Sequence, residues 1–188
     1  DVYYGMGATD KTVNFYEQLG AKGNNKAYLS LGYLYQEDKQ YNLAEENYLK
    51  AANNNVEGSK LALAEFYKSQ KKYDLAEKYY LEVKAEDADD GGLADLYIIQ
   101  KKYDLAEKLF QDSGKYDRQE ILSTIAGRAF NLEDYKTAEK YYLQEMKENP
   151  NSFYNQIPLA QSAEKTGNNS LAEEMYKKDI VSNLGEEN

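Results

Sequence analysis

Hydrophobic side chains recur along this chain every three or four residues, in pairs of segments separated by short polar breaks. The stripes of the first pair contain Tyr28, Leu31, Leu34 and Tyr35, then Tyr41, Ala44, Tyr48 and Ala51. Residues three and four positions apart lie on one face of an α-helix, so each stripe predicts an amphipathic helix. The polar break at residues 37–40 is short, and the pair therefore predicts a helical hairpin.

The hairpin pattern occurs five times, and each copy centres on an alanine followed by a glutamate. The repeated alanines are Ala44, Ala76, Ala106, Ala138 and Ala172. The steps between them are 32, 30, 32 and 34 residues. A period of this size is typical of solenoids, in which each supersecondary unit stacks on the next. We therefore predict a single all-α domain, an α-solenoid, over residues 1–188.

One more apolar stripe, formed by Val13, Tyr16 and Leu19, predicts a leading helix before the five antiparallel hairpins. The predicted ranges are 11–21 for the leading helix and 26–55, 57–86, 90–114, 118–148 and 153–182 for the hairpins. Apolar residues continue beyond Ala172 to Ile180. This predicts a C-terminal end that caps the last apolar face.

Small residues occupy one fixed position in each helix of a hairpin. The first-helix position holds Gly32, Ala64, Ala94, Ala126 and Ala160, and the second-helix position holds the repeated alanines. Two helices approach to about 8 Å only where the side chains at their crossing are small. These residues are therefore predicted to form the seams of the hairpins. Many of the 20 tyrosines fall at recurring positions, where a ring can be buried while its hydroxyl reaches the edge.

The start of each second helix carries a possible capping box, a short polar residue followed three positions later by glutamate. The pairs are Asn42–Glu45, Asp74–Glu77, Asp104–Glu107 and Ser170–Glu173. Lys136 and Glu139 break this pattern, so the fourth hairpin is predicted to open more easily, because a cap contributes about 1 kcal/mol. Pro158 is costly inside a helix, so its helix is predicted to begin near Asn155.

The composition excludes several classes of function. The chain has 30% charged residues, no cysteine and no histidine, which removes disulfides, thiol chemistry, most zinc sites and the commonest acid–base catalyst. Its net charge of -10 disfavours nucleic acids and anionic lipid surfaces. No apolar run approaches the roughly 18 residues of a spanning helix, so we expect no membrane insertion. Asp1 in the first position indicates a processed or truncated chain, and the compartment stays open.

Three specific functional interpretations fit the sequence less well than structural roles for the same residues. The acidic run 86–92 has clustered carboxylates but places Gly91 and Ile98 where a calcium loop needs ligands, so a solvated turn is favoured. Base stacking by the tyrosines would need a basic stripe, which is missing from this sequence. The adjacent Glu45 and Glu46 are typical of an exposed helix face. We therefore expect no catalytic residue, no metal and no cofactor.

The repeats resemble tetratricopeptide repeats. The residues that carry the resemblance are Leu31, Gly32, Tyr35, Tyr41, Ala44, Tyr48 and Ala51, then Tyr73, Ala76 and Tyr80, and Tyr103, Ala106 and Phe110. The leading stretch also resembles the related Sel-one-like repeats, in its segment FYEQLGAKGNNKAYLSLGYLY. The resemblance covers nearly the whole chain, although only the last step has the family's usual spacing of about 34 residues.

This resemblance implies a right-handed superhelix whose first helices line a concave groove for an extended peptide or a partner helix. First-helix residues outside the seam are the candidates for that groove. They are Leu29, Tyr33, Gln36, Leu61, Glu65, Lys68, Asp95, Ile98, Phe130, Ile157 and Gln161. This mixture of apolar and acidic residues favours a basic or partly apolar protein partner. The family's mode of clamping an acidic chaperone tail needs a basic set that these positions lack.

The sequence therefore predicts a non-enzymatic scaffold for protein–protein interaction. Two alternatives remain open, a structural module that self-associates and a regulatory or accessory domain of a larger assembly.

Overall fold

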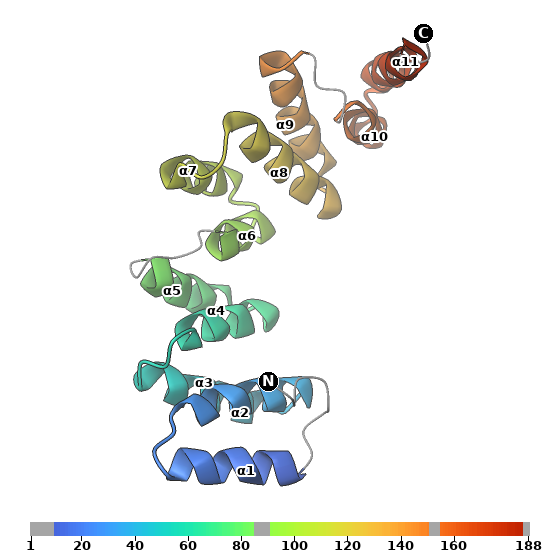
Figure 1. Ribbon diagram of the computed structural model, residues 1–188. Helices are drawn as coiled ribbons and strands as arrows, with labels where there is room; N and C mark the ends of the chain where they lie inside the picture. Colours follow the sequence, from blue (N-terminus) through green and yellow to red (C-terminus); the bar gives the residue numbers. More distant parts are fainter. Residues whose placement is uncertain (1–9, 85–90, 151–154, 186–188) are drawn as a thin grey trace. The chain divides into compact units, whose positions relative to one another are not determined.

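The computed structural model describes residues 10–84, 91–150 and 155–185, and over these residues it contains eleven α-helices and no strand (Figure 1). The helices are α1 (Asp10–Ala21), α2 (Lys26–Glu37), α3 (Tyr41–Asn53), α4 (Ser59–Ser69), α5 (Tyr73–Lys84), α6 (Gly91–Ile99), α7 (Tyr103–Ser113), α8 (Arg118–Asn131), α9 (Tyr135–Glu148), α10 (Gln156–Thr166) and α11 (Asn169–Gly185). The all-helical, solenoid fold class predicted from the sequence is confirmed. The acidic run at 86–90 lies outside the described residues.

The chain divides into two compact units, Asp1–Gly92 (unit 1) and Leu93–Asn188 (unit 2), whereas the repeat pattern predicts one domain over residues 1–188. In unit 1, α1 packs on α2, α3 packs on α4, and the pairs α2–α3 and α4–α5 form hairpins. In unit 2, α7 packs on α8 and α9 packs on α10, while α8–α9 and α10–α11 form hairpins. Each unit is therefore built by stacking successive helices on their neighbours.

The small residues at the seams form the centre of the core. Ala44, Ala76, Ala106 and Ala138 are 0% exposed, and their first-helix counterparts Ala64, Ala94, Ala126 and Ala160 are also 0% exposed. In the first hairpin the counterpart is Gly32, where an added Cβ would lie 2.5 Å from Cδ1 of Tyr48. The prediction that these residues lie in the seams of the hairpins agrees with this burial.

The turns inside the hairpins share one geometry. Lys39, Lys71, Lys101 and Glu133 have φ angles of 60°, 58°, 58° and 57°, in the left-handed region. The residue after each of them donates its N–H to the carbonyl five residues earlier, as Gln40 does to Tyr35 at 2.8 Å and Lys102 to Tyr97 at 2.8 Å. This is the hydrogen bond of a Schellman motif, which ends the first helix with its carbonyls satisfied.

The predicted capping boxes of α3 and α7 are wrong. These helices begin one residue earlier, at Tyr41 and Tyr103, and neither has a side-chain hydrogen bond at its N-cap. Since the Schellman turn places the tyrosine in the first turn, the predicted cap residues lie inside their helices. They are Asn42, Asp74, Asp104 and Ser170.

Side-chain caps occur instead at two helix starts in unit 2. Asp117 and Glu120 form a complete capping box before α8. Asp134 accepts a hydrogen bond from the Thr137 N–H at 3.3 Å, which caps α9. The prediction that the fourth hairpin is weakened by a missing cap therefore loses its basis. The predicted start of the Pro158 helix is confirmed, because α10 begins at Gln156 with Asn155 as its N-cap.

Candidate partner-binding surface

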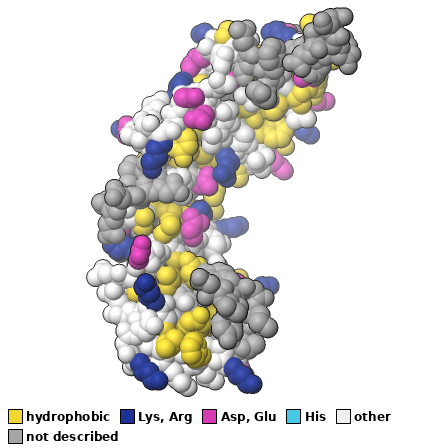
Figure 2. Space-filling model, in the orientation of Figure 1, with side chains coloured by type: hydrophobic (Ala, Val, Ile, Leu, Met, Phe, Trp, Pro, Cys, Tyr) yellow, Lys and Arg dark blue, Asp and Glu magenta, His cyan; other side chains and the backbone are white. Residues whose placement is uncertain are grey.

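The six candidate residues of unit 1 are all accessible to solvent. Leu29, Tyr33 and Gln36 on α2 and Lys68 on α4 are half-buried, while Leu61 and Glu65 on α4 are exposed. Hydrophobic side chains also reach the surface on the face of unit 1 drawn in Figure 2. These six positions can therefore contact another molecule without unfolding of the hairpins.

A buried tyrosine holds two of the α2 candidates in place. Tyr48 of α3 is 0% exposed, and its hydroxyl donates to Oε1 of Gln36 at 2.9 Å. The ring of Tyr33 meets the Tyr48 ring edge-on, with 5.3 Å between centroids and 85° between planes. Because Tyr48 is fixed in the seam, the positions of Gln36 and Tyr33 are set by the scaffold.

The equivalent tyrosine of the next hairpin, Tyr80, orients Glu65. Its hydroxyl donates to Oε1 of Glu65, and Nζ of Lys68 lies 2.8 Å from Oε2 of the same carboxylate. Lys68 also lies over the Tyr80 ring, 5.4 Å from its centroid. Leu61 and Glu65 are one helical turn apart on α4, so an exposed apolar side chain adjoins a fixed carboxylate.

In unit 2 the candidates are less uniform. Asp95 is half-buried, and its Oδ1 lies 3.2 Å from Nη2 of Arg128, so its charge already has a partner. Phe130 is half-buried against the edge of Tyr135, with 5.3 Å between ring centroids. Ile157 is half-buried and Gln161 is exposed. Four of the five residues are thus accessible, without a shared polar network among them in the described residues.

The prediction that Ile98 faces a groove is wrong, because its side chain is only 2% exposed. Ile98 occupies the position held by Gln36 in α2 and Lys68 in α4. Those polar side chains stay partly in solvent, whereas α6 has the apolar sequence GGLADLYII and buries Leu96 as well as Ile98. A short helix that is apolar on most of its circumference belongs largely to the core.

Three of the glutamates that follow the repeated alanines, Glu45, Glu107 and Glu139, were missed as contact residues. Glu45 accepts from the Tyr67 hydroxyl at 2.9 Å and pairs with Lys72 at 2.8 Å, both in the following hairpin. The same position in α9, Glu139, accepts from Asn168 at 2.9 Å and also from Thr166. These glutamates therefore bind one hairpin to the next. We call them the bridging glutamates.

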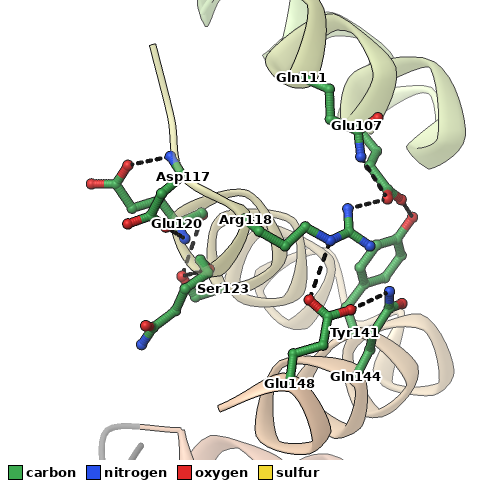
Figure 3. A network of polar contacts seen from close by, with 10 residues as sticks. Glu107, Gln111, Asp117, Arg118, Glu120, Ser123, Tyr141, Gln144 and Glu148 are labelled. Carbon is green, nitrogen blue, oxygen red and sulfur yellow. Dashed lines mark hydrogen bonds and ion pairs between the residues drawn. The ribbon is translucent and has the colours of Figure 1, made fainter. Parts of the chain in front are cut away.

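Glu107, the bridging glutamate of α7, is the centre of a larger network (Figure 3). Its Oε2 accepts from the Tyr141 hydroxyl at 2.9 Å and its Oε1 accepts from Arg118, which also lies 3.4 Å from Glu148. Burial alone would raise the pKa of Glu107, but the hydrogen bonds from Arg118 and Tyr141 hold it below its ordinary value. Burial and the Glu107 carboxylate together raise the pKa of Tyr141.

Comparisons with known proteins identify the family that two of the repeats match. Models of the tetratricopeptide repeat match residues 26–55 and 61–92, so these two segments are tetratricopeptide repeats. Such repeats generally mediate protein–protein interactions through their stacked surfaces. No curated protein matches the sequence. Within the described residues, no helix combines the length and apolar character needed to cross a membrane.

Two solved structures share the fold. The MamA protein superposes with a TM-score of 0.55 at 14% identity, over 84% of this chain and 90% of that chain. BtubC (BKLC) from P. vanneervenii gives a TM-score of 0.50 at 16% identity, over 95% of this chain and 89% of that chain. At these identities the likeness extends to the fold alone.

Proposed function

We propose that this chain is a non-enzymatic scaffold that binds another protein along the first-helix surface of its repeats. The observation that carries the proposal is the pair formed by Leu61 and Glu65 on α4. Leu61 is 38% exposed, and the neighbouring carboxylate is held by Tyr80 and Lys68. An accessible apolar side chain beside an oriented charge suits recognition, because little side-chain freedom is lost on binding.

The proposed partner is an extended peptide or a helix that carries an apolar residue near a lysine or arginine. The apolar residue contacts Leu61, and the cation meets the exposed part of Glu65, whose side chain is 47% exposed although Lys68 also pairs with it. The net charge of -10 favours the approach of a basic segment. The continuous right-handed groove and the Sel-one-like character of the N-terminal segment stay predictions.

Two charge-introducing variants of equal exposure test the proposal. Leu61 on α4 and Leu43 on α3 are both 38% exposed, but only Leu61 lies on a first helix. In pull-downs from a lysate of the source cells, Leu61→Glu is expected to lose the specific partner and Leu43→Glu to retain it. Circular dichroism checks that both variants remain helical. Loss of the partner in Leu43→Glu alone would reject the first-helix surface.

A second candidate function, self-association, rests on the apolar surface of α11. Ile180 and Val181 are 56% and 70% exposed on this helix. Larger exposed apolar patches mark contacts between proteins, and these two side chains are the ones in the described part of α11 that could contribute to such a contact. Light scattering after size exclusion, measured across concentrations, tests this function. A mass that rises with concentration in the wild type but not in Val181→Glu supports it, and a constant monomer rejects it.

A further inference from the structure

Glu145 is a carboxylate in a position that the first three hairpins fill with small or apolar residues and the fifth fills with Asp179. Seven residues after the repeated alanine, the first three hairpins carry Ala51, Val83 and Ser113, whereas α9 carries Glu145. Its side chain is 1% exposed. A buried carboxylate costs several kcal/mol unless charged or polar partners compensate it.

The hydrogen bonds of Glu145 are incomplete. Oε2 accepts from Nδ2 of Asn155 at 3.0 Å, but Oε1 is buried and has no donor among the described residues. The side-chain oxygen of Gln156, the residue after Asn155, is likewise buried without a donor. Buried acceptors in native proteins nearly always have a partner. Oε1 of Glu145 therefore lacks one donor among the described residues.

Glu145 lines a cavity of about 310 Å³, open to solvent, between the start of α8 and the end of α9. The charged residues of its wall are Asp117, Arg118, Glu145 and Glu148. Arg118 is already engaged by Glu107 and Glu148, which approach it from two sides (Figure 3). Three carboxylates against one guanidinium leave the wall negatively charged.

The helix ends strengthen this negative character. The last turn of α9 contributes Glu145, Glu148 and the adjacent Asn149 to the wall, and a helix C-terminus favours cations. The start of α8 lines the same wall with the opposite polarity, and the Asp117 carboxylate of its capping box, which accepts from the Glu120 N–H at 2.8 Å, offsets it. No three metal-ligating side chains of the described residues lie close enough together to hold one metal ion, so a metal ion is a poor fit.

We propose that this cavity binds an organic cation, a guanidinium or primary ammonium group, with Glu145 as its anchoring carboxylate. Such a group carries several N–H donors and supplies the one that Oε1 lacks. The terminal torsion of a glutamate is soft, so the carboxylate can turn its free oxygen toward the cavity. The volume matches the small end of ligand sites. The cation is either a side chain of a partner protein or a free amine.

Nuclear magnetic resonance titration of the isotope-labelled full chain tests the proposal. The probes are agmatine, the blocked peptide acetyl-Gly-Arg-Gly-amide, and the same peptide with neutral citrulline in place of arginine. We expect saturable shifts of the Gln119 and Asn149 backbone amides with a cationic probe at millimolar concentration, and none with citrulline. Binding of both cations supports a site for either source, binding of the peptide alone indicates a protein side chain, and binding of agmatine alone indicates a free amine.

Two variants with the same charge change locate the site. Glu145→Gln keeps the shape of the side chain and is expected to weaken cation binding at least about tenfold. Glu46→Gln, on the exposed surface of α3 in unit 1, is expected to leave binding unchanged. We also expect Glu145→Gln to raise the melting temperature, since a buried charge is removed. Absence of shifts with both cations, equal shifts with citrulline, or unchanged affinity in Glu145→Gln would overturn the proposal. If Glu145→Gln does not fold, the proposal is tested by comparing the arginine and citrulline peptides on the wild-type protein.

Discussion

The Tyr48 ring lies so close to Gly32 that a Cβ on this glycine would be 2.5 Å from Cδ1 of the ring. Tyr48 is 0% exposed and is held at its hydroxyl end by Gln36. The ring therefore has little room to move away. The closest helix approach of the first hairpin thus also fixes a residue of the proposed binding surface.

Gly32→Ala is expected to destabilise unit 1 by about 1–3 kcal/mol, because the added methyl group overpacks this contact. The matched control is Gly127→Ala on α8, where a Cβ would lie 3.6 Å from the Tyr142 hydroxyl, an ordinary contact distance. This control should be neutral or stabilising by up to about 1 kcal/mol, because alanine favours the helix. Urea denaturation of both variants measures the difference. Equal effects would contradict the close packing at Gly32.

Tyr67→Phe tests the bridging role of Glu45. The variant keeps the buried ring but removes the hydroxyl that donates to the carboxylate at 2.9 Å, so we expect a loss of about 1 kcal/mol in the free energy of unfolding. Tyr73→Phe on the neighbouring helix α5 serves as the control and should change stability less. A double-mutant cycle with Glu45→Gln completes the test. Strict additivity of Tyr67→Phe and Glu45→Gln would show that the contact contributes nothing.

The pH dependence of unit 2 follows from the lowered pKa of Glu107. A carboxyl whose pKa is lower in the folded state stabilises the fold above its ordinary pKa of 4.5, and this contribution is lost as the pH falls through the lowered value. Glu107→Gln should therefore cost about 1–2 kcal/mol near neutral pH, since the bonds to Arg118 and Tyr141 lose their charged acceptor. Denaturation at neutral pH and below the lowered pKa should show the difference from wild type shrinking in acid. A stability difference between the two proteins that stays constant with pH would contradict a lowered pKa for Glu107.

Ile98→Glu is expected to destabilise the fold by about 3–5 kcal/mol, because it buries an unpaired charge at a position that is 2% exposed. The adjacent Ile99 is 38% exposed on the same helix, so Ile99→Glu should change stability by no more than about 0.5 kcal/mol. Thermal unfolding followed by circular dichroism compares the two. A folded and stable Ile98→Glu protein would contradict the burial of Ile98.

The repeat period made the fold predictable, because burial of alanine at a crossing leaves a local and recurring signal. The role of the glutamates was harder to predict, since the spacing of Asp104 and Glu107 also satisfies a capping box. The long-range partner of Glu107, Tyr141, lies 34 residues away and leaves no local pattern. One signal was available. Glu139 keeps its place although Lys136 cannot form the cap, which indicates that the glutamate has another partner.

The candidate surface was predicted in part. Positions that hold polar residues in α2 and α4 are accessible, because burying a polar side chain without a partner costs free energy. Ile98 was misassigned because the same position in α6 holds an apolar side chain, which is buried in the core. The buried carboxylate of Glu145 could have been suspected from the sequence, since its position holds Ala51 in the first hairpin. The missing donor at its Oε1 could be found only in three dimensions.

Site-specific photo-crosslinking tests the proposed function most directly. A photoreactive phenylalanine analogue is placed at Leu61 or at Leu43, two leucines of 38% exposure on a first and a second helix. The proteins are irradiated in a lysate of the source cells, and adducts are identified by mass spectrometry. Our account predicts a discrete adduct at Leu61, in which the crosslinked segment contains a lysine or arginine, and no such adduct at Leu43. A discrete adduct at Leu43 with none at Leu61 would contradict it.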